Sequence, residues 1–361
     1  WTKGRPDEVW DTLCDKLRQN ASILVYNDET VIPAMKHIGV DAADAVNYSI
    51  HACNWPDITG GYAVVDTVGG PIPRMILETL LQDGKPRAAY DSIDAVYEAV
   101  EEHFRQSSRA NFAAYRARYR SGPLPSSGQL SCTDCFTAGT IEAARGLFDG
   151  GVKYPAIYVL LRNIGTAADM MAAVDSLVYR QKVCTLSRLA EALAQNFEGC
   201  EDILALCRRA PKFGRDDDLA DGHAVRLLNR LLDVVDEESV NEQGERDVLT
   251  LNVTITDMWH IQEGANLPAT PDGRLAGAPL SENLSPTVGV IESVTALLNS
   301  VSKLPFERIH SGAFNLRLRK DVVAEEAGLA RLQVLADTYL ENGGMQLQLS
   351  IADTAVLRQA Q

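Results

Sequence analysis

The spacing of apolar residues along the chain predicts mostly helical segments. Between Asp91 and Tyr119 they recur at helical spacing, and Ser121-Gly122-Pro123 follows, so we expect one long amphipathic helix there. Shorter stretches carry the same pattern. The other expected helices are Pro6–Arg18, Thr30–Ile38, Ala42–Ala45, Pro73–Leu81, Ala138–Leu147, Ala167–Gln181, Leu186–Asn196, Asp216–Val235, Val288–Ser302, Val323–Glu341 and Ala355–Gln361.

Fewer segments have the pattern of a strand. Residues 248–255 alternate between apolar and polar positions, which is typical of a half-buried strand. A long structured loop is expected over Pro268–Pro286, which is rich in proline, glycine, aspartate and serine. Strands separated by helices predict an α/β fold. The other expected strands are Ile23–Tyr26, Ala313–Leu318 and Met345–Ile351.

Overall composition excludes several classes of protein. The chain has 361 residues, of which 46% are hydrophobic and 23% charged, as in soluble globular proteins. Its net charge of −15 argues against nucleic-acid binding and against docking on anionic membranes. No apolar run reaches the roughly 18 residues of a membrane span. Seven cysteines at irregular spacing do not form a disulfide framework, so a reducing cytoplasm is expected.

A series of short motifs occurs in order along nearly the whole chain. It runs through Asn27-Asp28-Glu29, Gly150-Gly151-Val152-Lys153-Tyr154, Pro211-Lys212-Phe213-Gly214, Thr270-Pro271-Asp272-Gly273-Arg274, Pro279-Leu280, Ser285-Pro286, Gly289, Asn315 and Gly343-Gly344. This series resembles the glycyl radical enzyme family of the pyruvate formate-lyase type, from about Asn20 to Gln361. The resemblance implies about the C-terminal half of a ten-stranded α/β barrel with surrounding helices. Residues 1–361 are then one fragment of the barrel domain, and the C-terminal glycine radical domain is absent, since no Arg-x-x-Gly-Tyr segment occurs.

The resemblance also implies a reaction. Cys53 would be the thiyl cysteine of a lyase or dehydratase that cleaves a C–C, C–O or C–N bond of a small organic substrate. It lies between an extended approach, 46–52, and a turn-rich exit, so we expect a loop enclosed by sheet and facing a cavity. The radical would be stored on a glycine outside the chain and installed by an S-adenosylmethionine-dependent iron–sulfur activase. The family further implies an anaerobic, cytoplasmic homodimer with no metal and no other bound cofactor, and this chain alone would be inactive.

The residues around Cys53 depart from the family's familiar subclasses. Dehydratases carry Cys-Val-Glu-Pro, whose glutamate transfers protons, whereas Trp55 takes that place here. Formate-lyases carry two adjacent cysteines, but Cys53 stands alone. His51 could supply a general acid, and Asp66 lies where dehydratase-like members place a carboxylate that contacts the substrate. With Asn54 and Trp55, these residues are the candidate substrate-binding positions.

Two alternatives remain open at this point. One is a barrel related to ribonucleotide reductase, although the chain shows no phosphate-binding motif. The other is a non-catalytic relative or partner subunit of a radical enzyme. Three further patterns are expected to be structural: Cys132-x-x-Cys135 as a coincidence, Gly150-Gly151 as close backbone packing, and Asp216-Asp217-Asp218 as a helix cap.

Overall fold

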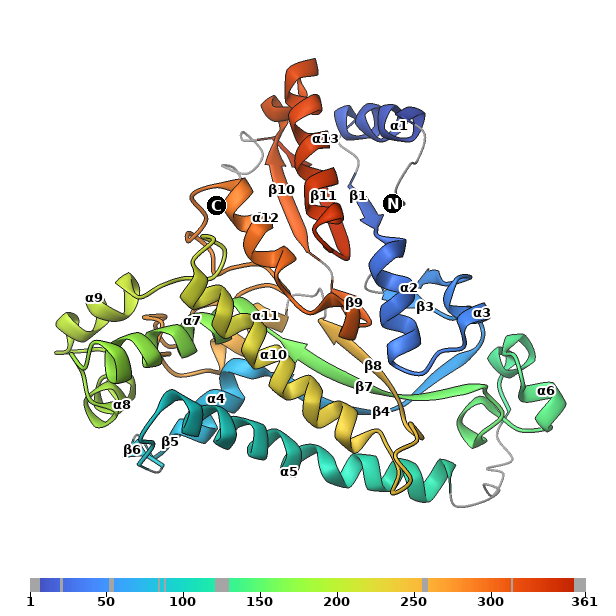
Figure 1. Ribbon diagram of the computed structural model, residues 1–361, viewed down its shortest axis with the longest axis horizontal. Coiled ribbons are helices and arrows are strands. Elements are labelled where there is room, and N and C mark those ends of the chain that lie inside the picture. Colours follow the sequence, from blue (N-terminus) through green and yellow to red (C-terminus); the bar gives the residue numbers. More distant parts are fainter. Residues whose placement is uncertain are drawn as a thin grey trace.

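A parallel sheet forms the centre of the computed structural model, which describes residues 7–19, 22–51, 55–83, 85–87, 89–120, 130–254, 259–312 and 314–353. Its strands follow the order β4-β7-β8-β9, and neighbouring strands are parallel (Figure 1). The middle strand β7 is an almost uninterrupted apolar run, which is typical of a strand covered on both faces. The bounds are β4 Tyr62–Pro71, β7 Tyr154–Arg162, β8 Leu249–Thr254 and β9 Ser311–Gly312.

Helices cover one face of this sheet. The long helix α5 packs on β4, and α10 packs in turn on α5 and α7 (Figure 1). Side chains cap two of these helices: Ser92 accepts a hydrogen bond at the start of α5, and Asp217 accepts two at the start of α10. The acidic run at the start of α10 therefore includes the expected cap. The bounds are α4 Ile72–Leu80, α5 Ile93–Tyr119, α7 Ile164–Val174, its π-helical extension Asp175–Arg180, and α10 Asp218–Glu238.

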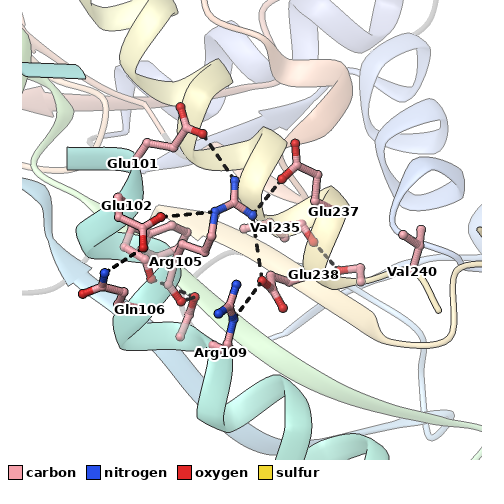
Figure 2. A network of polar contacts seen from close by, with 12 residues as sticks. Glu101, Glu102, Arg105, Gln106, Arg109, Val235, Glu237, Glu238 and Val240 are labelled. Carbon is pink, nitrogen blue, oxygen red and sulfur yellow. Dashed lines mark hydrogen bonds and ion pairs between the residues drawn. The ribbon is translucent and has the colours of Figure 1, made fainter. Parts of the chain in front are cut away.

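Ion pairs join α5 to α10 along their exposed sides. Figure 2 shows the guanidinium of Arg105 at the centre of this network, with its side chain only 18% exposed. It lies 2.7 Å from a carboxylate oxygen of Glu237 on α10 and 3.3 Å from Glu101 on α5. Arg230 of α10 reaches back to Glu101 at 3.0 Å. The two helices are therefore linked by shared rather than isolated charge pairs.

A second, smaller sheet gathers the two ends of the described chain. Its order is β1-β11-β10, with β1 antiparallel and β10 parallel to β11. The buried amide of Asn27 fixes this arrangement, because its nitrogen donates to the carbonyl oxygens of Leu340 and Gly344, each at 2.8 Å. The elements around this sheet are β1 Ile23–Tyr26, β10 Asn315–Arg319, β11 Gln346–Ala352, α1 Asp7–Arg18, α12 Val294–Ser302 and α13 Glu326–Glu341.

Short elements connect these layers. The hairpin β2–β3 and the small hairpin β5–β6 each stand apart from the two main sheets. Within the described ranges, no helix has both the length and the apolar character needed to cross a membrane. The remaining elements are α2 Asp28–His37, α3 Ala42–Ala45, β2 Ser49–His51, β3 Trp55–Asp57, β5 Leu81–Gln82, β6 Lys85–Pro86, α6 Thr140–Ala143, α8 Leu186–Ala194, α9 Glu201–Arg209 and α11 Trp259–Ala265, with 3₁₀ turns at Cys132–Phe136, Leu147–Asp149, Phe306–Arg308 and Lys320–Val323.

Most expected elements are present, but two central strands were not expected. The sequence pattern missed β4 and β7, and it also missed α9 and α11. The helix expected over Ala138–Leu147 is a single turn flanked by the left-handed residues Gly139 and Ala144, which interrupt it at both ends. The helix expected from Val288 begins only at Val294, and the one expected over Ala355–Gln361 lies outside the described residues.

Candidate functional site

The hairpin β2–β3 brackets the predicted catalytic cysteine. Its strands pair antiparallel, with His51 opposite Trp55 and Ser49 opposite Asp57. Residues 52–54, which connect the strands, lie outside the described residues, as does the side chain of His51. The predictions for Cys53, Asn54 and His51 therefore stay predictions, and the structure of the site is built from the hairpin's flanks.

Trp55 holds the hairpin against the central sheet. Its ring meets the edge of Tyr158 on β7, with the ring centroids 4.8 Å apart and the planes at 84°. The side chain is buried, yet the indole Nε1 has no hydrogen-bond partner among the described residues. Leaving such a donor unpaired costs on the order of 1–3 kcal/mol. The indole N–H is therefore a candidate contact for a polar group of a substrate.

A chain of hydroxyl groups runs from β7 to the hairpin. The Tyr158 hydroxyl donates to Tyr62 on β4, and the Tyr62 hydroxyl donates to the buried carboxylate of Asp57 on β3. Burial and the charge of Asp57 raise the pKa of Tyr62 to about 12, although the bond from Tyr158 opposes this. Tyr62 thus stays protonated near neutral pH, and the two hydroxyls form a connected series that is oriented toward the carboxylate of Asp57.

His310, which precedes β9, contacts the hairpin from the other side. Its imidazole donates to the backbone carbonyl of Pro56, and the bond is made by Nε2, because Nδ1 has no hydrogen-bond partner in the part of the chain that the structure describes. Pro56 has no N–H to donate to β2, and its carbonyl oxygen accepts the hydrogen bond from His310. Burial lowers the pKa of His310 to about 4. The ring is therefore neutral at physiological pH and presents an unshared acceptor nitrogen.

Asp66 lies on the opposite face of the sheet. The β4–β7 register pairs Asp66 with Ile157 and Thr67 with Tyr158, and successive side chains alternate between faces. Asp66 accepts a hydrogen bond from Asn111 of α5 at 3.0 Å, on the helix-covered side. The structure therefore does not bring Asp66 together with Trp55, and the predicted substrate contact of Asp66 stays a prediction. The physical reason for this placement is a β-bulge between Val64 and Asp66, which shifts the register of β4.

Among the residues that the structure describes, no group of three or more histidine, cysteine, aspartate or glutamate side chains is placed to hold a metal ion. Cys132 and Cys135 are exposed and lie within one 3₁₀ turn, Cys132–Phe136, which the side chain of Asp134 caps at its start. Their pairing in the sequence reflects this turn rather than a built site.

Sequence reasoning found Trp55 but missed Asp57, Tyr62, Tyr158 and His310. Asp57 carried a local signal, since it lies two residues after Trp55 and so on the same face of a strand. Tyr158 and His310 come from segments about 100 and 250 residues further along. Only the register of a sheet that the sequence did not predict brings them to the hairpin.

Comparison with known proteins matches both parts of the chain to family models. Residues 1–258 match the pyruvate formate lyase-like model, and residues 280–361 match the glycine radical model. The models thus divide the chain near residue 280, where the sequence analysis treated residues 1–361 as one domain. The expectation that the radical-bearing segment itself is absent stays a prediction.

Individual relatives are radical dehydratases and lyases. The chain is 28% identical to trans-4-hydroxy-L-proline dehydratase of Clostridioides difficile, over 100% of this chain and 47% of the relative. It is 27% identical to isethionate sulfite-lyase of Bilophila wadsworthia, over 93% and 42%. The structure of the B12-independent glycerol dehydratase from Clostridium butyricum superposes with a TM-score of 0.82 at 25% identity, covering 100% of this chain and 47% of that one. The chain thus spans about half the length of the relatives it matches, and its sheets form part of their barrel.

Proposed function

The chain belongs to the pyruvate formate lyase-like family of glycyl radical enzymes, and we propose that it forms the cysteine-bearing half of a thiyl-radical lyase or dehydratase. The observation that carries the proposal is the hairpin that brackets Cys53. Three separate interactions hold it: Trp55 on Tyr158, Asp57 with Tyr62, and His310 on the carbonyl of Pro56. Such bracing suits a thiol that must meet a C–H bond with little positional error.

Cys53 is the proposed hydrogen-atom carrier. A radical glycine, where one is present, abstracts the hydrogen atom of the Cys53 thiol and so converts the thiol to a thiyl radical. The Cys53 sulfur then takes a hydrogen atom from a substrate carbon, which makes it a thiol again, and returns a hydrogen atom to the product radical after the leaving group has departed, so the thiyl radical is regenerated. Burial of the flanks keeps water from the reacting carbon.

Proton transfer at this site is assigned to groups other than the family's glutamate. An indole cannot exchange protons usefully, so Trp55 bounds the site with its ring and can donate a hydrogen bond from its indole N–H. The neutral imidazole of His310 can accept a proton at Nδ1 from a substrate hydroxyl or ammonium group. The series Tyr158–Tyr62–Asp57 is oriented toward the carboxylate, so it can accept a proton at the Tyr158 oxygen and pass it on to Asp57. Contacts from His51 and Asn54 remain part of the proposal.

Activation and setting follow from the family. We expect a radical S-adenosylmethionine iron–sulfur activase as partner, a small-molecule substrate, a homodimer, an anaerobic reaction and a cytoplasmic location. The substrates of the relatives define the panel to test first, namely trans-4-hydroxy-L-proline, isethionate and glycerol, as these relatives' names state.

The decisive experiment replaces Cys53 by serine in the complete, anaerobically activated enzyme that contains this chain. The O–H bond of serine is too strong for the relay, so turnover should be lost while the glycyl radical signal persists in electron spin resonance. Cys132→Ser is the matched control, because that cysteine is exposed and lies far along the chain, and it should retain turnover. Turnover by the Cys53→Ser enzyme would refute the assignment. A wild-type enzyme that carries the radical yet never exchanges substrate hydrogen would favour a non-catalytic relative.

A further inference from the structure

A cavity of about 650 Å³ lies away from the cysteine hairpin, at the C-terminal end of α9. Figure 1 places α9 and β3 on opposite sides of the molecule. Three of the motif segments found in the sequence meet around this cavity: Pro211–Gly214, Thr270–Arg274 and the stretch from Pro279 to Gly289. None of the described hairpin residues lines it, so the proposed reaction gives these segments no role.

Cationic side chains dominate the wall of the cavity. Arg208, Lys212, Arg215 and Arg274 line it, against the single carboxylate of Asp272. In a chain with a net charge of −15, four cations around one hollow depart strongly from the average surface. Concave clusters of one sign concentrate ligands of the opposite sign.

The buried members fix the charge in place. The Lys212 side chain is only 7% exposed, and its ammonium donates to the carbonyl of Cys207 at 2.8 Å. Arg274 donates to the carbonyls of Gly264, Pro268 and Ala278, at 2.6 to 2.9 Å, so its charge is present without a carboxylate partner. Neither side chain can swing out to solvent.

The nearby carboxyls compensate this charge only in part. Burial raises the pKa of Asp169, behind the wall, to about 8, and burial also raises the pKa of Asp272, although Lys212 opposes both shifts. Asp169 therefore carries less than a full negative charge near neutral pH. The cavity keeps an excess of positive charge that solvent does not reach fully.

Two exposed arginines, Arg208 and Arg215, supply further contacts at the rim. Arg215 pairs with Glu292 at 2.9 Å and donates to the carbonyl of Val290. Arg208 has no ion-pair partner among the side chains that the structure describes. It stays beside the loop because Gly273, at φ +88°, approaches so closely that a Cβ would lie 2.7 Å from its Cγ. A guanidinium held in this way is suited to bidentate contact with a carboxylate or phosphate.

We propose that this cavity binds a small molecule with two or more oxyanion groups, such as an organic phosphate or a polycarboxylate. Arg208 and Arg215 grip the oxyanions, and Lys212 supplies the fixed charge behind them. The volume falls within the range of roughly 300–1,000 Å³ that is typical of small-molecule sites. This site goes beyond the proposed radical chemistry and stands on different residues.

Calorimetric titration of the purified chain at low ionic strength tests the site, with pyrophosphate and citrate as separate probes. Wild-type protein should bind at least one probe saturably. Arg208→Gln and Arg215→Gln should each weaken that binding about tenfold, as expected for the loss of a charge-assisted contact. Arg209→Gln is the matched control, because it removes the same charge from the next residue of α9, which does not line the cavity.

The outcomes separate cleanly. Binding of pyrophosphate alone identifies a phosphate site, and binding of citrate alone identifies a carboxylate site. Absence of saturable binding to folded wild-type protein overturns the proposal and points to an acidic protein surface as the partner of these cations. Equal weakening in the Arg209→Gln control also overturns it, since the binding would then be non-specific attraction to positive charge.

Discussion

Replacing His310 by glutamine should remove a pH dependence of stability that the buried imidazole imposes on the fold. The side chain is 2% exposed, and burial lowers its pKa from 6.5 to about 4. Glutamine is close in size, can still donate to the carbonyl of Pro56, and does not titrate in this range. The substitution thus separates the protonation of residue 310 from its contact with the hairpin.

The direction of the effect follows from proton uptake. As pH falls through 6.5, the unfolded chain binds a proton at His310, whereas the folded protein does not until about pH 4. The contribution of the neutral ring to stability is therefore fully present above pH 6.5 and is lost as the pH falls from 6.5 to 4. A shift of this size corresponds to about 3 kcal/mol of unfolding free energy.

Urea unfolding of both proteins at pH 7.5, 5.5 and 4 measures the effect. The stability advantage of the wild type over His310→Gln should shrink by about 3 kcal/mol between the first and last pH. Other titrating groups, such as His223, occur in both proteins and cancel in the difference. Trp55→Phe is the control, because it disturbs the same hairpin without removing a titrating group, so its deficit should not change with pH. A wild-type advantage that is equal at pH 7.5 and 4 would show that His310 is not held neutral by burial.

Three further substitutions test the framework, each by urea unfolding at neutral pH. Arg105→Met should cost about 1 kcal/mol, and less at high salt, because it removes the centre of the network in Figure 2. In the wild type, the ring nitrogens of His223 lie 2.7 Å from the Tyr97 hydroxyl and 3.1 Å from the Asp175 carboxylate. His223→Phe should therefore cost about 2 kcal/mol of unfolding free energy, because both buried groups lose this hydrogen bond. An unchanged urea midpoint would refute this expectation. Asn27→Ala should cost about 2 kcal/mol through two buried hydrogen bonds to the C-terminal part of the chain, whereas a cost below about 0.5 kcal/mol would show that water replaces them.

Helix periodicity in the sequence predicted the outer layer of the fold well. The expected helix Asp91–Tyr119 is observed as Ile93–Tyr119, because a long amphipathic stripe and a polar stop are both local signals. Two strands of the central sheet, β4 and β7, were not predicted, for physical reasons. β7 is a parallel strand covered on both faces and so has no alternation, whereas β4, at the edge of the sheet, contains Gly69 and Gly70 as well as a bulge. Their pairing depends on contacts between distant segments.

The residues of the candidate site likewise fall into those with a local signal in the sequence and those without one. Trp55 and Cys53 could be named because they stand in one tetrapeptide that resembles a family loop. Asp66 was named by counting residues along the chain, and such a count does not register the bulge in β4 that places Asp66 on the face away from Trp55. His310 and Tyr158 gave no local signal, because nothing near either residue indicates that it will meet the hairpin.

The indole in place of the family's glutamate changes the charge of the site more than its shape. Around the described part of the hairpin, the groups that face Trp55 and Pro56 are a phenol and a neutral imidazole. The carboxylate of Asp57 is separated from Tyr158 by the hydroxyl of Tyr62. A leaving group that needs a strong acid would find none among these described groups, because the tyrosine hydroxyls are oriented toward the Asp57 carboxylate. Under the proposed function, substrates whose leaving group departs with weak assistance, or already carries its proton as an ammonium, therefore suit this hairpin better than a simple alcohol does.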